Sequence, residues 1–523
     1  MKKENLILTG FMGTGKSTVG ILLAQQLDYD FVDTDKMIET RKHRSIAAIF
    51  REEGEAAFRR LEAQISRELA KRHGLVIATG GRLMLDQDNA ALLDATGPVF
   101  CLTAEPDVIL ARLAGDEGRR PLIEGPQPDQ RIRELLEKRA AAYGRFPQID
   151  TSGRSPEQIA AEIHLLLDKE VLPVTYPHGR YNVLVGTELF PFIRQLARIK
   201  GPLAIITDNN VGPLHADRCG MADTVVTISA GEQYKTLATV NYIYNELLAA
   251  GLDRQGTILA LGGGVVGDVA GFVAATYLRG VDLIQSPTSL LAMVDASVGA
   301  KTGVDLPQGK NLVGAFKQPL AVFADLETLT TLPSEEFSSG MAEVIKSGLI
   351  ADPDLFTSLE TGERIKRPNN LADARKVKSM VTSAIKVKRQ IVQEDPFEKG
   401  RRAVLNLGHT FAHAIEQVSG YAVRHGEAVG LGMVAAAHLS ASLGVCSEKL
   451  QPRIEAALEK SGLPRRIPVN LSPIALHQAM GSDKKIAGGR LHFILIRDVG
   501  DVFVTSDITD GAILQTLAAC SAN

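Results

Sequence analysis

Short apolar runs alternate with longer amphipathic runs along the N-terminal third of the chain, and this pattern predicts strands separated by helices. The expected strands are Asn5–Thr9, Asp30–Asp33, Leu75–Thr79 and Val99–Thr103. The main expected helices are Lys16–Gln26, Ser45–Ala70 and a last one that begins at the cap Ser155-Pro156 and ends near Lys169. Strands joined by helices form a parallel sheet that is covered on both faces. We therefore predict a three-layer α/β domain over residues 1–172.

A Pro- and Gly-bearing stretch follows, and we predict a domain boundary near residue 172. The alternation then resumes, and beyond Pro333 the pattern becomes almost wholly helical. The expected strands of this second part include Tyr181–Val185, Leu203–Thr207, Thr257–Leu261, His492–Ile496 and Val502–Val504. We predict an α/β lobe over residues 173–332 and a mainly helical lobe over residues 333–523, with a cleft between these two lobes.

The composition is that of a globular protein, since 45% of the 523 residues are hydrophobic and 23% are charged. Lys and Arg total 58 against 61 for Asp and Glu, so the net charge of −3 provides no overall basic field for nucleic acid. The four cysteines are far apart, which argues against a disulfide framework or a thiolate zinc site. The longest run of small apolar residues, Ala428–Ala437, is too short to span a bilayer. We expect a soluble, cytoplasmic protein that binds neither nucleic acid nor membrane.

A candidate phosphate-binding loop lies near the start of the chain, directly after the first expected strand. The segment Gly10–Ser17 satisfies GxxxxGK[ST] and lies between an expected strand and an expected helix. Its glycines let backbone N–H groups converge on a phosphate, and the N-terminus of the following helix adds partial positive charge. Lys16 is expected to reach the β- and γ-phosphates, and the Ser17 hydroxyl to bind Mg²⁺. This segment predicts a site for ATP with magnesium.

The phosphate acceptor is expected at the same edge of the sheet. Asp33 and Asp35 follow the second strand, where one carboxylate can hold the Mg²⁺ shell and the other can orient or deprotonate a hydroxyl. The pair Gly80-Gly81 permits close approach of a ligand to the backbone. Arg119-Arg120 lies in a Gly-, Asp- and Pro-rich stretch that is typical of a loop able to close over a transferring phosphate.

These motifs resemble shikimate kinase in order and spacing over about residues 1–170. The resemblance rests on the phosphate-binding loop, Asp33-Thr34-Asp35, Gly54-Glu55 leading to Phe58-Arg59, Thr79-Gly80-Gly81, Arg120-Pro121-Leu122, and Arg139 before Tyr143. Two positions depart from the family: Arg82 replaces a third glycine, and Gly144-Arg145 replaces an acidic pattern. The alternative is another small kinase of this class that acts on gluconate or a nucleoside monophosphate.

The resemblance implies three groups of site residues in this part of the chain. The implied contacts of shikimate are Asp35, Arg59, Gly81 and Arg139. The implied contacts of ATP are Gly13, Thr14, Gly15, Lys16, Ser17, Thr18, Arg112 and Arg120, with Mg²⁺ at Ser17 and Asp33. The residues expected to act in phosphoryl transfer are Lys16, Asp35 and Arg120.

A second glycine-rich segment, Gly262–Asp268, follows an expected strand and opens the helix-like run Val269–Tyr277. Glycines at this spacing suit a dinucleotide pyrophosphate at a helix N-terminus. The polar segments Thr207–Asn210 and Gly231–Lys235 also follow strands, so they are candidates for ribose and adenine contacts.

A metal site is predicted in the helical lobe. His409 and His413 are four residues apart on one helix face, His425 follows, and Glu343 lies on an earlier helix. Imidazoles with one carboxylate and an open position are typical of catalytic zinc. The spacing leaves open which histidine stays off the metal. Cations and amides in the same region indicate an anionic substrate: Lys301, Lys310, Lys346, Lys388, Arg402, Asn311 and Asn406.

The second part resembles 3-dehydroquinate synthase over about residues 173–515. The shared motifs are Gly-Glu-x-x-Lys at 231–235, the glycine run ending in Asp268, Tyr277–Gly280, Pro287-Thr288-Ser289, Asp295 with Lys301, Gly309-Lys310-Asn311, Met341–Lys346, Asn406–His413, His425-Gly426-Glu427 and Asp483-Lys484-Lys485. Small departures are Ser289, Ala300 and Ser339. Members of this family are commonly homodimers, so we expect a homodimer through this part.

The resemblance implies zinc, or another divalent metal such as cobalt, on Glu343, His409 and His425, with His413 as a general acid or base. The implied NAD contacts are Asp208, Asn210, Glu232, Lys235, Gly264, Val265, Val266, Gly267, Asp268, Thr288, Ser289, Lys301, Lys310, Thr328, Leu329, Thr330 and Thr331. The implied contacts of the phosphorylated substrate are Arg279, Asp295, Lys301, Lys310, Asn311, Lys346, Lys388, Arg402, Asn406, Lys484 and Lys485, of which Lys301, Lys346, Lys388 and Arg402 are expected to be catalytic.

The implied reaction converts 3-deoxy-arabino-heptulosonate 7-phosphate to 3-dehydroquinate and phosphate, with NAD acting as a recycled cofactor. The alternatives are a metal-dependent polyol dehydrogenase, which needs no phosphate-binding lysines, and a fusion in which one half only binds or regulates. The sequence thus predicts one polypeptide with two active sites that serve the route to chorismate and the aromatic amino acids.

Overall fold

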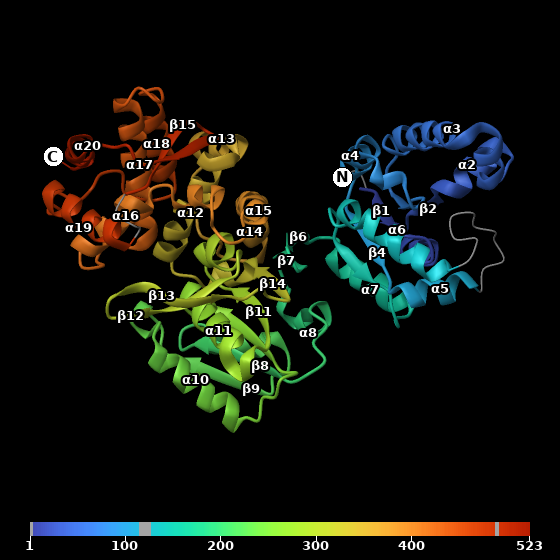
Figure 1. Cartoon of the computed structure of the whole chain (residues 1–523), viewed down its shortest axis with the longest axis horizontal. Coiled ribbons are helices and arrows are strands. Elements are labelled where there is room, and N and C mark those ends of the chain that lie inside the picture. Colours follow the sequence, from blue (N-terminus) through green and yellow to red (C-terminus); the bar gives the residue numbers. More distant parts are fainter. Residues whose placement is uncertain (1–3, 115–126, 487–490, 523) are drawn as a thin grey trace. The chain divides into compact units, whose positions relative to one another are not determined.

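A computed structural model describes residues 4–114, 127–486 and 491–522, with side chains left undescribed between 482 and 486. The chain folds into two compact units, Met1–Thr175 and Tyr176–Asn523. Both units are mixtures of helices and strands, and the predicted α/β class is confirmed (Figure 1).

The first unit is built on a five-stranded sheet of order β2-β3-β1-β4-β5, in which every pair is parallel. Its strands are β1 (Leu6–Gly10), β2 (Asp30–Asp33), β3 (Leu75–Ala78), β4 (Val99–Thr103) and β5 (Gln148–Asp150). Its helices are α1 (Lys16–Leu27), α2 (Thr34–Lys42), α3 (Ile46–Leu69), α4 (Gln87–Asp94), α5 (Pro106–Ala114), α6 (Pro128–Tyr143) and α7 (Pro156–Leu166). The carboxyl ends of parallel strands share one edge of the sheet, so the segments after β1, β2 and β3 meet there.

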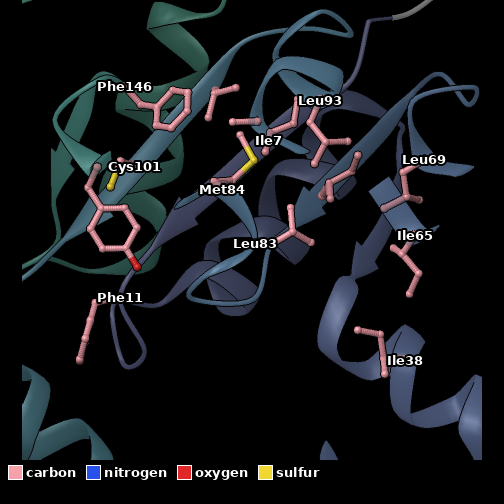
Figure 2. Packing of buried hydrophobic residues seen from close by; sticks show 14 of the residues in the cluster. Ile7, Phe11, Ile38, Ile65, Leu69, Leu83, Met84, Leu93, Cys101 and Phe146 are labelled. Carbon is pink, nitrogen blue, oxygen red and sulfur yellow. The ribbon is translucent and has the colours of Figure 1, made fainter. Parts of the chain in front are cut away.

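The core of this unit explains why its central strands β1, β3 and β4 are mostly apolar. Every residue of β1 and β3 is buried, because helices cover both faces of the sheet. Figure 2 shows Ile7 and Cys101 of the central strands among buried side chains that include Leu83, Met84 and Phe146. This rigid sheet fixes the positions of the loops at its carboxyl edge.

The other large sheet has seven strands in the order β6-β7-β14-β11-β10-β8-β9, and its six strands from β7 to β9, which belong to the second unit, are all parallel. Its strands are β6 (Glu170–Tyr176), β7 (Gly179–Gly186), β8 (Leu203–Asp208), β9 (Thr224–Ile228), β10 (Thr257–Gly262), β11 (Asp282–Pro287) and β14 (Ala321–Asp325). The helices associated with it are α8 (Ile193–Leu196), α9 (Gly212–His215), α10 (Leu237–Ala249) and α11 (Gly264–Thr276). A separate hairpin is formed by β12 (Lys301–Leu306) and β13 (Gly309–Phe316).

The chain after residue 333 is mainly helical, as predicted. Its helices are α12 (Ser334–Ala351), α13 (Pro353–Thr361), α14 (Leu371–Lys376), α15 (Lys378–Glu394), α16 (His409–Val418), α17 (His425–Ser442), α18 (Leu450–Lys460), α19 (Pro473–Ile486) and α20 (Asp510–Cys520). The antiparallel strands β15 (Phe493–Asp498) and β16 (Asp501–Thr505) form a second hairpin. Within the described part of the chain, no helix combines the length and the apolar character needed to cross a lipid bilayer.

Two of the differences from the sequence prediction concern helix α11 and a hairpin. Helix α11 begins at Gly264, five residues before the predicted start at Val269. The sequence pattern does not indicate this start, because the first turn consists of glycine and valine, which are weak helix formers. The β12–β13 hairpin was not predicted. The hairpin contains glycines because its two strands approach each other closely. A Cβ atom added at Gly314 would lie 2.3 Å from the carbonyl oxygen of Thr302.

Candidate active sites

The phosphate-binding loop connects β1 to α1, and side chains of the motif donate hydrogen bonds to its carbonyl oxygens. Gly13 and Gly15 have φ of +76° and +90°, a conformation that L-residues rarely adopt. Lys16 Nζ donates to the carbonyl oxygens of Gly10 and Phe11 at 3.0 and 2.8 Å, and Thr14 Oγ1 donates to Phe11 at 2.8 Å. Helix α1 has no side-chain cap at Gly15, so its first N–H groups face the loop. This geometry suits a bound phosphate.

Two aspartates lie beside this loop. Ser17 Oγ donates to Asp33 Oδ2 at 2.8 Å, and Asp33 also caps α2 by accepting from the backbone N–H groups of Asp35 and Lys36. Burial and the neighbouring Asp33 carboxylate raise the pKa of Asp35 to about 6. The Ser17 and Asp33 oxygens form an oxygen pair of the kind that Mg²⁺ prefers.

The carboxylate of Asp35 lies against a glycine. A Cβ atom added at Gly80 would be 2.3 Å from Asp35 Oδ1, and Gly80 N–H donates to Thr34 Oγ1 at 2.8 Å. The carbonyl oxygen of Gly81 accepts hydrogen bonds from Arg139 and Tyr143. Residues from the ends of β2 and β3 and from α6 therefore meet at one place, as the sequence predicted for the acceptor.

Arg59 is the other guanidinium assigned to the acceptor. It lies 2.5 Å from Glu62 and 3.1 Å from Glu55, and its guanidinium carbon is 5.3 Å from the centre of the Phe58 ring. Glu62 is buried, and this burial raises its pKa despite the adjacent Arg59. Arg59 is thus held by two carboxylates and one aromatic face.

Arg82 and Arg145, which depart from the kinase pattern, both donate hydrogen bonds to nearby groups. Arg82 Nη1 donates to Glu55 Oε1 at 2.7 Å, and both side chains are about half exposed. Arg145 Nη2 donates to the carbonyl oxygen of Met84 at 2.9 Å.

Of the arginines assigned to ATP, Arg112 donates hydrogen bonds to the carbonyl oxygens of Gly13 and Thr151. Arg119 and Arg120 lie outside the described residues.

Replacement of Arg82 by glycine is expected to have a small effect on this unit. The Arg82–Glu55 ion pair is exposed to solvent, and such pairs contribute about 0.2–1 kcal/mol. We expect the KM for the phosphate acceptor to change by less than about fivefold in the Arg82→Gly variant. Steady-state kinetics measure this change, and a KM shift above tenfold would mean that Arg82 contacts the acceptor directly.

The N-terminus of α11 forms a second cradle without side-chain caps. Its N-cap residue is Gly263, and the following Gly264 leaves room for a ligand, since an added Cβ would first meet Ala296 at 3.6 Å. Thr288 and Ser289 follow the neighbouring strand β11, and Thr288 N–H donates to the carbonyl oxygen of Gly262 at 2.9 Å. The free N–H groups at this helix end fit a pyrophosphate.

Other residues assigned to NAD are tied to their own surroundings. Asp208 Oδ1 accepts from the backbone N–H groups of Asn210 and Val211, each at 2.9 Å. Lys235 Nζ lies 2.6 Å from both Asp268 Oδ2 and Asn311 Oδ1. Thr331, in the turn that carries Thr328–Thr331, lies 2.9 Å from His215 Nε2. These contacts fix the loops at the carboxyl edge of the sheet.

Glu343, His409 and His425 come together in the helical part, with one potential ligand atom from each residue within 4.8 Å of the others. They lie on α12, α16 and α17. Glu343 Oε2 pairs with Lys346, whereas the buried Glu343 Oε1 has no hydrogen-bond partner among the described residues. A buried carboxylate oxygen without a partner is costly, so these donors fit a divalent metal that would satisfy it. His413 lies next to the group, with its ring 5.7 Å from that of His409.

A cavity of about 530 Å³ contains several of the predicted cations. Lys301, Lys388 and Arg402 line it together with Asp268, Asp295 and Asn311. Lys388 pairs with Asp295 and Lys301 with Glu398, while the buried Arg402 donates to the carbonyl oxygens of Pro396 and Gly299. Burial alone would raise the pKa of Asp295, but the Lys388 ammonium holds it well below the usual range. The cavity wall therefore holds three cations beside two aspartates.

Some predicted residues are not brought to this cavity. Arg279 is exposed at the end of α11 opposite Gly264 and is not part of the cavity wall. Asn406 is exposed before α16 and also lies outside the wall. Lys484 and Lys485 belong to α19, but their side chains are not among the described residues.

Two acidic residues near these sites were missed from the sequence. Glu398 pairs with Lys301, and its φ of +55° lies in the left-handed region, which is uncommon for a residue other than glycine. Glu416 is buried between His425 and Lys310. Glu416 had a detectable signal, because it lies three residues after His413 and therefore on the same face of α16.

The fold and the two sites define a fusion enzyme, in which a P-loop kinase unit is followed by a unit with an α/β lobe and a metal-binding helical lobe. Family models match in the same order: shikimate kinase over residues 12–168, the N-terminal domain of 3-dehydroquinate synthase over 225–339 and its C-terminal domain over 340–486. The chain belongs to the 3-dehydroquinate synthase family and carries a shikimate kinase domain at its N-terminal end.

Relatives and solved structures agree with this assignment. The chain is 43% identical to a 3-dehydroquinate synthase of Synechococcus over 361 residues, which are 66% of this chain and 98% of the relative. It is 46% identical to that of Acidithiobacillus ferrooxidans over 358 residues, 66% and 95% of the two chains. A crystal structure of 2-deoxy-scyllo-inosose synthase with carbaglucose-6-phosphate, NAD⁺ and Co²⁺ is 27% identical with a TM-score of 0.61, covering 67% of this chain and all of that one. The 2-epi-5-epi-valiolone synthase of Streptomyces hygroscopicus with NAD⁺ and Zn²⁺ is 26% identical with a TM-score of 0.60, covering 66% and 98%.

Proposed function

We propose that this chain catalyses two reactions of the shikimate pathway. The first unit phosphorylates shikimate with ATP to give shikimate 3-phosphate. The second unit converts 3-deoxy-arabino-heptulosonate 7-phosphate to 3-dehydroquinate and phosphate. The observation that carries the proposal for the second unit is the unsatisfied Glu343 oxygen grouped with His409 and His425. Costly buried groups of this kind are typical of functional sites.

In the kinase unit, each residue is assigned a role that follows from its position. Lys16 and the first N–H groups of α1 hold the ATP phosphates, while Ser17 and Asp33 hold Mg²⁺, which would neutralise charge on the transferring phosphoryl group. Asp35 accepts the proton of the attacking hydroxyl. Arg59 and Arg139 bind the carboxylate of shikimate. This carboxylate takes the place of part of the contacts that Arg59 makes with Glu55 and Glu62.

The raised pKa of Asp35 predicts an acid limb in the kinase reaction. A general base acts only when ionised, and burial beside Asp33 raises the pKa of Asp35 to about 6. The kcat/KM for shikimate is therefore expected to fall about tenfold per pH unit below pH 6 and to be level above pH 7. A pH profile at saturating ATP and magnesium measures this limb. An unchanged rate at pH 5 would contradict the role of Asp35.

In the synthase unit, we assign the metal to Glu343, His409 and His425, where zinc or cobalt would polarise an oxygen of the substrate. NAD is assigned to the N-terminus of α11, where it would accept and return a hydride. The supporting features are the uncapped Gly263-Gly264 turn and the three donors within 4.8 Å of one another. His413, next to this group, is positioned to hold or move a proton.

The substrate of this unit carries a phosphate and a carboxylate, and the cavity offers matching cations. Lys301, Lys388 and Arg402 line the wall, and Lys346 lies beside Glu343. We assign them to the two anionic groups of the substrate. Binding of the substrate must displace Glu398 from Lys301, since the two side chains pair in the free protein. The alternative polyol dehydrogenase needs no such cluster of cations.

One experiment tests both activities. The purified chain is assayed for shikimate phosphorylation and for release of phosphate from the heptulosonate, before and after dialysis against a chelator. We expect both activities at the start, and loss of only the second when zinc is removed and magnesium is supplied again. Net formation of NADH with a polyol such as glycerol, without phosphate release, would contradict the synthase assignment. Equal phosphorylation of gluconate would contradict the kinase assignment.

We also propose that the chain forms a homodimer through its synthase unit. The support is the family relationship of this unit. Light scattering of the whole chain measures its mass directly, and a mass of one chain across a broad concentration range would contradict the dimer.

A further inference from the structure

Glu416 is a buried carboxylate beside the metal-binding group that the assigned functions do not use. Its side chain is only 7% exposed. One carboxylate oxygen, Oε2, lies 3.5 Å from His425 Nδ1, and the other, Oε1, lies 3.7 Å from Lys310 Nζ. Burial of a charged carboxylate is unfavourable unless cations or donors surround it, and here each oxygen has one such group.

The position of Glu416 follows from the packing of two helices. It lies seven residues after His409 on α16, and two turns of a helix return nearly to the same face. Helix α17 packs against α16 and begins with His425. The imidazole of His425 therefore stands between Glu416 on one side and the Glu343–His409 pair on the other, with rings of His409 and His425 5.3 Å apart.

Both imidazoles have the same arrangement. His409 Nδ1 lies 3.3 Å from the carbonyl oxygen of Leu407, while its Nε2 lies 3.9 Å from Glu343 Oε1. His425 likewise has Nδ1 near an oxygen, that of Glu416, which leaves Nε2 as the atom available to a metal. An oxygen that accepts from one ring nitrogen fixes the tautomer and the ring orientation, and a carboxylate makes the other nitrogen a stronger ligand.

We propose that Glu416 is a positioning residue for the metal, acting through His425. This inference rests on the proposed metal site at Glu343, His409 and His425. Glu416 holds the proton on Nδ1 of His425 and turns Nε2 toward the bound ion. It is the only one of the two acceptors that carries charge, because the partner of His409 is a backbone carbonyl.

Lys310 gives the same carboxylate a second function. This lysine comes from β13, and its ammonium also lies 4.6 Å from the centre of the Tyr421 ring and 3.9 Å from Glu232. Glu416 thus links a metal ligand of the helical lobe to the β12–β13 hairpin. Because Lys310 contacts the oxygen that does not face His425, its removal should leave the hold on the imidazole in place.

The test measures the affinity of the whole chain for Zn²⁺ by competition with a chromogenic chelator. We expect Glu416→Ala to raise the dissociation constant about 10–100-fold, and Glu416→Gln, which keeps a neutral acceptor, to raise it less. Lys310→Met should change it by less than about threefold. The matched control is Glu427→Gln on α17, whose carboxylate pairs with Arg424 at 3.6 Å instead of with a metal ligand. Its zinc affinity should equal that of the unaltered chain.

Two further readouts separate the possible failures. The absorption spectrum of the Co²⁺-substituted chain should change in Glu416→Ala and Glu416→Gln, because the ligand field at His425 changes. The melting temperature of the metal-free variants measures separately whether Glu416 stabilises the fold. Equal zinc affinity and equal spectra in all variants would overturn the role of Glu416 alone. Failure of the unaltered chain to bind zinc, with His409→Ala no different, would overturn the metal site as well.

Discussion

The His409→Ala variant is expected to lose synthase activity by more than about a hundredfold while its kinase activity stays within about twofold of the unaltered chain. The imidazole is one of three donors grouped within 4.8 Å, so its removal leaves an incomplete metal site. Even a change outside the direct ligands commonly costs 10–100-fold in metal affinity or activity, and loss of a ligand costs more. The kinase site belongs to a separate compact unit, Met1–Thr175, and shares none of these residues.

A second histidine variant makes this result specific. His438→Ala changes a histidine of α17 whose Nδ1 lies 3.1 Å from Gln451 Oε1, away from the three metal donors. Both activities of this variant should match those of the unaltered chain. Phosphate release from the heptulosonate and phosphorylation of shikimate are measured on the same preparations. Full synthase activity in His409→Ala would mean that the metal is bound elsewhere, and parallel loss of both activities would mean that the two sites depend on each other.

The Lys16→Ala variant is expected to show the reverse pattern. Its ammonium donates to the carbonyl oxygens of Gly10 and Phe11, which holds it at the phosphate-binding loop. Loss of one preorganised charged donor to a transferring group typically costs about 10²–10³ in rate. We therefore expect kcat for shikimate phosphorylation to fall by that factor, while synthase turnover remains unchanged.

The control for this variant is Lys42→Ala, at the end of α2. Lys42 lies 3.9 Å from Glu53, and neither residue has been assigned to a substrate. Its kinase rate should be unaltered, and the melting profile of Lys16→Ala should show that the first unit still folds. A kinase rate within threefold of normal in Lys16→Ala would contradict phosphate binding by this loop.

Local patterns made much of the fold predictable. The parallel sheet of the first unit and the helical nature of the chain after Pro333 follow from short-range periodicity, which burial on both faces of a sheet enforces. The phosphate-binding loop could also be predicted from the sequence. Its glycines adopt positive φ angles, and a short contiguous motif is enough to encode this conformation. Such features depend on neighbours in sequence.

Pairings between distant side chains could not be predicted in this way. Glu398 pairs with Lys301 from almost a hundred positions away, and no periodic pattern relates the two. The direction of the Arg82 side chain could not be predicted either. Glu55 forms ion pairs with both Arg82 and Arg59, and these pairs exist only in the folded unit, where α3 lies near the end of β3. Glu416 needed the packing of α16 on α17 before its partners were known.

The pairing of Glu343 with Lys346 has a consequence for how the interior of the helical part tolerates this carboxylate. One oxygen of this carboxylate already has an ammonium partner within its own helix. The carboxylate and the ammonium are both almost fully buried, so each one offsets part of the cost of removing the other from water.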